Sequence, residues 1–461
     1  MTILDNPVSP TRLPAPTPPR RRLSFFQFVQ ALRKSAIESF AQDAYESDIL
    51  EQKMFRRSLF VVNEPGAIKR VLIDNAANYQ KTEITRRILE PGLGKGLITS
   101  EGETWRAHRR IMQPAFDIRS IAAYVPVMTT AAEELLEQWD KVPAGTAVDV
   151  ATSMMEVTLN IISRTMFSND SDDIVAIMER SAGRYQVEMR PNIMDMLGCP
   201  KWLAGLPRRK VPARTLGEFD RVVDRLIKER TRDPESYPKD LLARLVGARD
   251  EQTGAGMSAQ EVRDHVITIF LAGHETTAMA LTWTWFLLSQ HSDVESKLHA
   301  EIDSVLAGRA PTHEDLSKLV YTRMVIDESM RIYPPVHTIA RQAIGDDVLA
   351  GIRIPKNSTV MISPWLLHRH LKLWDNPSVF DPERFSPERS SGRARFSYLP
   401  FGGGKRICIG AAFSLTEATV LLAALAQRYR LALAPGHRVE PQGLITLRAR
   451  YGMKMLLHPR G

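Results

Sequence analysis

One long helical pattern at residues 258–289 constrains the fold of this 461-residue chain more than any other feature. It begins with Ser-Ala-Gln-Glu at 258–261, the capping-box spacing in which serine and glutamate side chains satisfy free backbone N–H groups at a helix start. Residues 266–288 are strongly apolar, but they include His274 and Glu275. A helix that is apolar on all sides is buried in the core of a protein. The pattern therefore predicts a long buried helix, not a membrane span.

A second feature is the run Phe-Gly-Gly-Gly-Lys-Arg-Ile-Cys-Ile-Gly at 401–410, which places Cys408 just before a helical pattern at 411–428. Free N–H groups at a helix N-terminus stabilise a thiolate, and glycines let the backbone approach a flat ligand closely. A lone cysteine is commonly a small buried apolar residue. A phosphate loop is disfavoured because the Gly-x-x-x-x-Gly-Lys-Ser/Thr pattern is missing. The run favours a thiolate bound to the metal of a large planar cofactor.

This run resembles the haem-ligand loop of the cytochrome P450 family, whose pattern is Phe-x-x-Gly-x-Arg-x-Cys-x-Gly. Phe401, Gly404, Arg406, Cys408 and Gly410 occupy all the fixed positions. The resemblance implies a thiolate-ligated haem b, with Cys408 on the iron and Phe401, Arg406 and Gly410 beside the cofactor. It extends from about residue 58 to about residue 457, so it implies the family's fold, a single large helical domain with small sheets.

The hexapeptide Ala-Gly-His-Glu-Thr-Thr at 272–277 lies in the middle of the long helix. A glycine there costs about 1 kcal/mol, and threonine can bond back to a carbonyl one turn earlier, so we expect a helix opened locally for a ligand. A zinc-protease site is excluded because Ala278 replaces the second histidine, which leaves His274 a packing role. By the resemblance, Glu275 and Thr276 are the catalytic acid–alcohol pair that relays protons for O–O cleavage.

Basic residues at three further places resemble the family's donors to the haem propionates. Trp105 and Arg109 show the Trp-x-x-x-Arg spacing, Arg341 follows Tyr-Pro-Pro, and Arg406 lies in the ligand loop. Buried carboxylates require such charge-assisted donors. His108 could also face the haem edge, but its spacing does not match.

A structural network is implied by Glu328 and Arg331, which lie three residues apart and so share one face of a helix. Such a pair is common on protein surfaces. Arg384, in the run Pro-Glu-Arg-Phe, completes the family pattern. The resemblance implies a buried Glu328–Arg331–Arg384 network under the ligand loop, with a structural and not a catalytic role.

Composition and local patterns set the frame for the whole chain. The net charge of +8 is too modest to indicate nucleic acid binding, and the two cysteines, Cys199 and Cys408, fit a reducing compartment. Residues 1–22 are proline-rich and polar, so we expect a flexible arm or a strap along the surface, without a membrane anchor, followed by one domain at 23–461. Strands are predicted at 58–62, within 334–360 and within 444–457, and a mobile loop at 191–212.

The predicted enzyme is a cytoplasmic, bacterial monooxygenase that inserts one oxygen atom from O2 into a fatty acid, terpenoid or steroid-like molecule. The apolar positions that the family uses for the substrate pocket are Ile98, Leu271, Ala272, Ile339, Leu444 and Ile445. Because no flavin or ferredoxin module is recognisable, we expect a separate ferredoxin- or flavodoxin-type donor. Its expected docking residues are Arg106, Arg110, Lys405, Arg393 and Arg395. The alternatives are a peroxide-driven peroxygenase and a haem sensor without catalysis, although neither needs the acid–alcohol pair.

Overall fold

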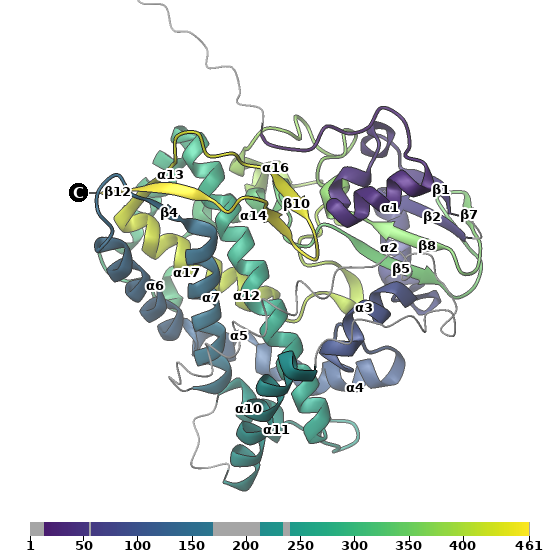
Figure 1. Cartoon of the computed structure of the whole chain (residues 1–461), viewed down its shortest axis with the longest axis horizontal. Coiled ribbons are helices and arrows are strands. Elements are labelled where there is room, and N and C mark those ends of the chain that lie inside the picture. Colours follow the sequence, from purple (N-terminus) through teal and green to yellow (C-terminus); the bar gives the residue numbers. More distant parts are fainter. Residues whose placement is uncertain (1–12, 55–56, 169–212, 234–239, 461) are drawn as a thin grey trace, which may run out of the picture.

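The computed structural model describes residues 13–54, 57–168, 213–233 and 240–460. Within them helices dominate, and the strands form small sheets. Figure 1 shows the helices around α12 on the left and the largest sheet, with α1 and α2, on the right. This arrangement confirms the predicted mainly helical fold with a minor β region. The loop predicted at 191–212 and Cys199 lie outside the described residues.

The framework of the molecule is a set of long helices joined by shorter ones. In chain order the longer helices are α1 (Phe25–Lys34), α3 (Glu83–Leu93), α4 (Gly102–Met112), α6 (Val125–Asp140), α7 (Val150–Phe167), α10 (Ala213–Arg232), α12 (Ala259–Gln290), α13 (Ser292–Leu306), α14 (Val320–Ile332) and α17 (Ala411–Arg428). The shorter ones are α2 (Pro65–Lys69), α5 (Ile118–Ala122), α11 (Leu241–Gly247), α15 (Pro364–Leu367) and α16 (Pro387–Ser390).

The long central helix α12 confirms the strongest sequence-based prediction. Its capping box is formed, since the Ser258 N–H donates to Glu261 Oε2 at 2.8 Å and the Glu261 N–H donates to Ser258 Oγ at 3.3 Å. It packs along α7 and against α10, α14 and α17, and it crosses the middle of the molecule (Figure 1). The helix runs unbroken through 272–277, and Thr276 Oγ1 donates to the Ala272 carbonyl at 2.8 Å. The expected local opening is therefore not a break in the helix.

The largest sheet joins strands from opposite ends of the chain. Its order is β1 (Ile49–Met54), β2 (Arg57–Val62), β8 (Thr359–Ile362), β5 (Ile339–Ala343) and β3 (Tyr79–Gln80), with β2 and β8 parallel and the other pairs antiparallel. The remaining strands form the sheet β4 (Ala147–Asp149), β12 (Lys454–Pro459), β9 (Tyr429–Leu433) and the pairs β10 (Pro441–Gly443) with β11 (Leu447–Ala449) and β6 (Asp347–Leu349) with β7 (Ile352–Ile354). The predicted strands at both ends of the chain are thus present.

The described part of the proline-rich arm, residues 13–22, lies against the folded body. Leu13 is buried, and the Pro14 carbonyl accepts a hydrogen bond from the Tyr333 hydroxyl at 2.9 Å. These residues follow the strap alternative and not a free tail. Of the helices that the structure describes, none has the length and apolarity needed to span a bilayer.

A buried ion pair ties α14 to the long segment that leads toward the cysteine loop. Arg331 donates to both carboxylate oxygens of Glu328, at 2.6 and 2.8 Å, and both side chains are 0% exposed. Arg331 also donates to the carbonyls of His368, Pro377 and Val379. Arg384, in the short 3-10 helix at Pro382–Phe385, lies 3.4 Å from Glu328. This geometry places the three residues of the expected network together.

Removing one partner of this pair should destabilise the fold. The variant Arg331→Met removes the bidentate partner of the buried Glu328 carboxylate and leaves it only the more distant Arg384, at 3.4 Å, so we expect the free energy of unfolding to fall by about 3–5 kcal/mol in urea denaturation. The matched control Arg353→Met breaks the exposed Arg353–Asp346 pair. It should change the free energy of unfolding by about 1 kcal/mol at most. Equal losses in the two variants would contradict a special role for the buried pair.

Candidate active site

The cysteine loop is held close to the segment at 70–74 by its glycines. Gly404 has φ +70°, and a Cβ on it would lie 2.1 Å from the Leu72 carbonyl oxygen, so only glycine fits there. The Cys408 N–H donates to the Phe401 carbonyl at 3.0 Å and closes the loop. α17 begins three residues later, at Ala411. The sulfur of Cys408 is a free thiol on accessible surface.

The environment of Cys408 opposes an uncompensated thiolate. Although the side chain has accessible surface, the surrounding protein desolvates it, and this desolvation raises the pKa of the thiol. The backbone N–H of Gly410 and the charge of Arg109 act in the opposite direction. Arg109 is held here because it donates to the Ile407 carbonyl at 2.8 Å. A sulfur in this setting ionises readily when a cation binds it.

A group of cations lies beside the loop. The Arg406 guanidinium stacks over the Trp105 ring at 4.2 Å and pairs with Glu101. Burial lowers the pKa of Arg341 to about 10, with the charge of Arg406 as a further cause. The sequence-predicted residues Trp105, Arg341 and Arg406 are therefore neighbours.

Lys81 belongs to the same group, and sequence reasoning missed it. Its ammonium donates to the carbonyls of Leu97 and Ser100, at 3.0 and 3.1 Å. Burial lowers the pKa of Lys81 to about 7, with the charges of Arg406 and Arg341 as further causes and Glu101 acting against them. The one available signal was a lysine directly after β3, which the sequence does not distinguish from a surface lysine.

Accessible side chains occur in one short stretch of the otherwise buried part of α12. Between Asp264 and Leu288, every residue is buried except Leu271, Ala272, Gly273 and Thr276. This stretch coincides with the hexapeptide, so the predicted ligand face is accessible without a break in the helix.

A hydrogen bond connects this stretch to the helix that follows the cysteine loop. Thr277 and Ser414, on α17, share a hydroxyl–hydroxyl contact of 2.9 Å. Further along α17, Glu417 is buried against Thr277, and burial raises the pKa of Glu417 to about 8, so this acid is protonated at neutral pH. The contact joins residues 137 positions apart and brings the two predicted motifs into one region of the fold.

Glu275 is paired, which the sequence did not predict. One of its carboxylate oxygens accepts from Thr446, just before β11, and from Arg448, on β11. The pairing explains how a carboxylate can be buried in α12 at acceptable cost. It also means that Glu275 is engaged away from Thr276 in this structure.

The pairing places the β10–β11 turn, with Leu444 and Ile445, next to α12. His337 Nε2 contacts the Leu444 carbonyl at 2.8 Å, which brings the turn close to Ile339 at the start of β5. Ile98 and Leu271 both pack at the margin of the main core. These contacts group Ile339, Leu444 and Ile445.

Two histidines near the site have other roles. His274 points into the helix packing, where its Nδ1 lies 2.8 Å from the Phe270 carbonyl. His108 turns away from the Arg109 side of α4 and contacts α12, at Glu261 and His265.

The residues expected to dock an electron donor divide into two groups. Arg393 stacks on Trp374 and Phe385, at 4.6 and 4.7 Å, and Arg110 pairs with Asp250 at 2.7 Å, so both serve the fold. Arg106, Arg395 and Lys405 are exposed.

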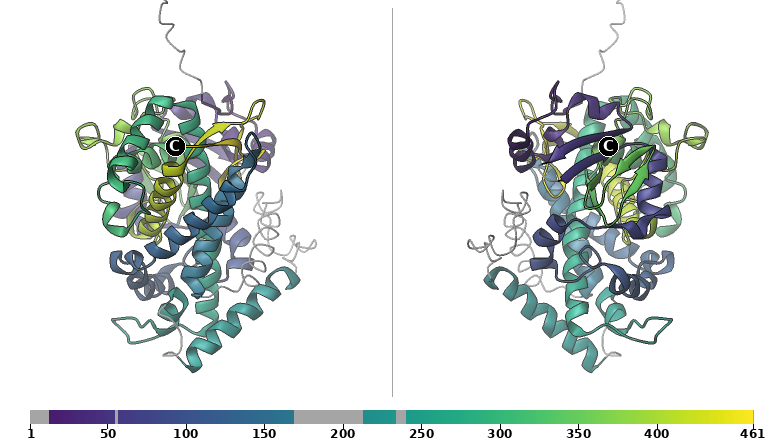
Figure 2. Two further views of the ribbon diagram at one scale, coloured as in Figure 1. Left: turned by 90° about the vertical axis from the view of Figure 1, so that its left-hand side faces the viewer. Right: turned by 90° about the vertical axis from the view of Figure 1, so that its right-hand side faces the viewer.

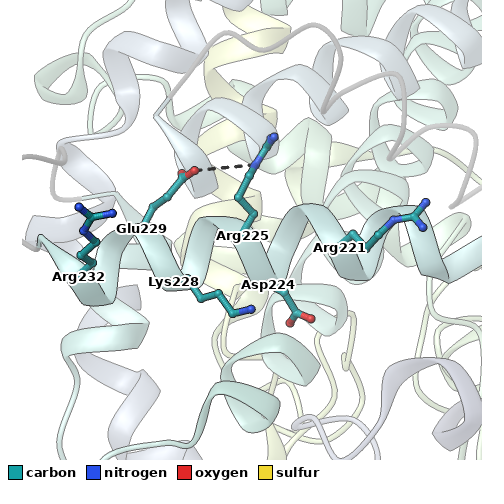
Figure 3. A pocket seen from close by; sticks show the side chains of 6 residues that line it. All are labelled: Arg221, Asp224, Arg225, Lys228, Glu229 and Arg232. Carbon is teal, nitrogen blue, oxygen red and sulfur yellow. Dashed lines mark ion pairs between the residues drawn. The ribbon is translucent and has the colours of Figure 1, made fainter.

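A hollow on α10 is not part of this site. Its lining consists of charged side chains of α10 alone, Arg221, Asp224, Arg225, Lys228, Glu229 and Arg232 (Figure 3). Figure 2 shows α10 at one end of the molecule, crossing the end of α12. Highly charged, single-helix linings do not suit the apolar ligand pockets of enzymes.

The residues of the site fit a haem. An accessible, desolvated sulfur stands where an iron ligand would be needed, and the cations of the buried Lys81 and the half-buried Arg341 and Arg406 suit two propionates. Each of these cations is penalised by burial, and an anionic group would offset that penalty.

Comparisons with known proteins agree with this fit. The family model described as cytochrome P450 matches residues 16–450. Cyclooctatin synthase of Streptomyces melanosporofaciens is 37% identical, over 93% of this chain and 92% of its own length. Pentalenene oxygenase of Streptomyces avermitilis is 33% identical, over 87% and 88%. The crystal structure of the cytochrome P450DA heme domain superposes with a TM-score of 0.84 at 26% identity, covering 98% of this chain and 99% of that one. The chain belongs to the cytochrome P450 family and is a monooxygenase for a hydrophobic substrate.

Proposed function

We propose that this monooxygenase holds haem b through Cys408 and oxidises a terpenoid. The observation that carries the proposal is the accessible sulfur in the closed loop, together with Arg109 beside it and the neighbouring group of Lys81, Arg341 and Arg406. Bound haem would supply the activation of dioxygen and the transfer of one oxygen atom to the substrate. The chain would supply the thiolate, the donors for the propionates and the protons.

Thr276 is proposed to present a hydroxyl to the reacting oxygen. Its side chain is part of the accessible stretch, and its hydroxyl donates to the Ala272 carbonyl, so its oxygen can accept a hydrogen bond from a donor or a water. Glu275 is proposed to be the acid of the pair. Since Arg448 and Thr446 hold one of its oxygens, it would pass protons only by changing these contacts.

The proposed substrate class is a terpenoid. The grouped side chains at Ile339, Leu444 and Ile445 are apolar and offer no cation for a fatty acid carboxylate. Relatives named for cyclooctatin and pentalenene act on terpenoids. An apolar lining with few polar groups suits a cyclic hydrocarbon skeleton.

The proposed electron donor is a separate ferredoxin or flavodoxin in the bacterial cytoplasm. Its acidic surface would meet Arg106, Arg395 and Lys405, the exposed members of the predicted docking face. The peroxygenase alternative is not favoured, because this chain retains both Glu275 and Thr276.

The thiolate ligand can be tested with the two cysteines of the chain. In Cys408→Ser, we expect the reduced, carbon monoxide-treated protein to lose the red-shifted Soret band that thiolate ligation produces, because serine supplies no thiolate. Cys199→Ser is the matched control and should keep the band. A Cys408→Ser protein with the wild-type spectrum would refute the assignment.

Lys81 should contribute to haem retention in a pH-dependent way. Burial lowers its pKa to about 7 in the chain alone, and a neighbouring propionate would raise it again, so the ammonium would form on haem binding at pH 8. In Lys81→Gln, haem transfer to apomyoglobin should be roughly tenfold faster at pH 8, as loss of one charge-assisted hydrogen bond implies. The difference should shrink as pH rises and Lys81 loses its proton. Lys95→Gln, at an exposed position, should transfer haem at the wild-type rate.

Substrate class can be tested by equilibrium binding to the oxidised holoenzyme. We expect pentalenene to displace iron-bound water and shift the Soret band to the blue at micromolar concentration, whereas palmitate should bind at least tenfold more weakly because its carboxylate would be buried unpaired. Tighter binding of palmitate would overturn the terpenoid proposal and leave the haem assignment intact.

A further inference from the structure

A chain of three titratable side chains connects α4 to α12, apart from the site described above. His108 Nε2 lies 3.1 Å from Glu261 Oε1, and His108 Nδ1 lies 2.9 Å from His265 Nε2. Glu261 is 38% exposed at its side chain, His108 is buried and His265 is 0% exposed. The chain therefore leads from solvent into the core.

The chain has two complete hydrogen-bond arrangements with the same atoms in contact. In one, protonated Glu261 donates to His108 Nε2, His108 Nδ1 donates to His265 Nε2, and His265 Nδ1 carries a proton at the inner end. In the other, His108 Nε2 donates to ionised Glu261, His265 Nε2 donates to His108 Nδ1, and His265 Nδ1 is bare. Neutral imidazole has one donor and one acceptor nitrogen, so each arrangement satisfies the two contacts.

The inner end of the chain carries two polar atoms that lack partners. Among the described residues, no hydrogen-bond partner is present for His265 Nδ1 or for Thr268 Oγ1, and both atoms are buried. Buried polar atoms without partners are rare and call for a functional explanation. Thr268 follows His265 by three residues, so the two side chains share a face of α12.

The same face of α12 continues to the accessible stretch that contains Ala272 and Thr276. Residues 261, 265, 268, 272 and 276 follow one another at spacings of three or four, which is one stripe of a helix. Thr276 lies eight residues beyond Thr268, or about 12 Å along the axis, and Ala272 between them is accessible. On this face Ala272 and Thr276 are accessible, whereas His265 and Thr268 are buried.

We propose that Glu261, His108 and His265 form a proton relay that supplies the Thr276 side of the site along this face of α12. The inference rests on the proposed role of Thr276 and extends it, because it names the source of the protons. It is needed because Glu275, the expected donor, is engaged by Arg448 and Thr446. None of the three relay residues contacts the reacting atoms, so they act through Thr276.

Each passage through the relay is balanced in protons. One proton leaves Glu261 or a water for His108 Nε2, the Nδ1 proton of His108 moves to His265 Nε2, and the Nδ1 proton of His265 leaves toward Thr268. Both rings end neutral with their tautomers exchanged, and Glu261 ends ionised. Glu261 is then reprotonated from solvent, and a change of tautomer restores the first arrangement.

Burial and the neighbouring charges keep the His265 ring neutral at rest. Burial and the neighbouring His108 lower the pKa of His265 to about 4, against the opposing effect of Asp264 and Glu261. Asp264 is itself committed to Arg263, Gln260 and the Lys95 N–H, at 2.9, 2.9 and 2.7 Å. A ring that is neutral at pH 7 can both accept and release a proton.

The variant His265→Gln tests the relay. Glutamine keeps an amide N–H for the contact with His108 but cannot take up a proton at one end and release it at the other. With a plant ferredoxin and its reductase as donor and pentalenene as probe, we expect about tenfold slower oxygen reduction, a larger solvent isotope effect and more hydrogen peroxide released per electron pair. The control His299→Gln removes a histidine of α13 whose pKa burial also lowers to about 4, and it should behave as wild type.

Two further measurements separate a relay from a structural clamp between α4 and α12. Hydrogen peroxide brings oxygen, electrons and protons together, so peroxide-driven turnover of His265→Gln should equal that of the wild type. The double variant His108→Gln/His265→Gln should be no slower than either single variant, since each single change already interrupts the same relay. In nitrogen-15 spectra of histidine-labelled, reduced carbon monoxide protein, His265 should remain neutral to about pH 5, and His108→Gln should shift its resonance.

Three results would overturn the relay. The first is a folded His265→Gln protein whose solvent isotope effect and peroxide release equal those of the wild type. The second is a peroxide-driven turnover of His265→Gln that falls as much as its ferredoxin-driven turnover. The third is a His265 ring that carries two protons at pH 7. Failure of the proposed function is distinguishable, because wild-type protein would then lack the thiolate spectrum before any histidine is changed.

Discussion

Desolvation of charge is the constraint that organises this site. The protein surrounds the Cys408 sulfur closely enough to disfavour its thiolate, and it buries Lys81 and Arg341 closely enough to disfavour their cations. A bound iron would compensate the cost of the Cys408 thiolate, and two propionates would compensate the cost of the Lys81 and Arg341 cations. The affinity for the cofactor and the ionisation of its ligands therefore have the same physical origin.

The helix α12 is the element through which the remaining parts of the site are related. One side packs into the core along α7, where Thr158 donates to the His274 carbonyl at 2.9 Å. Another contacts α17 through Thr277 and Ser414, and so lies near the cysteine loop. A third side carries residues 261, 265, 268, 272 and 276, the stripe that begins at Glu261. A single long helix can serve all these contacts because its residues face different directions at every step of the turn.

Local patterns predicted much of this architecture. The boundaries of α12 and α17, the strand ending at Val62 and the strands near both chain ends follow from capping, apolar periodicity and turn residues, which act over a few positions. The glycine loop was recognisable for the same reason. The Glu328–Arg331 pair was predictable because its partners are three residues apart on one helix, whereas its three carbonyl partners were not.

Contacts between distant segments escaped prediction for a physical reason: charge and hydrogen bonding depend on which side chains the fold brings together. Lys81 and Arg393 look like surface cations in sequence, yet one is buried among cations and the other is stacked on Trp374 and Phe385. His108 and His265 lie 157 positions apart, and only the crossing of α4 and α12 joins them. By itself the sequence determined the cysteine loop, the long buried helix and the adjacency of Glu275 and Thr276, since these depend on neighbouring residues. The tertiary structure decided which cations converge, what Glu275 pairs with and where the histidines lead, because burial and pairing are properties of packed elements.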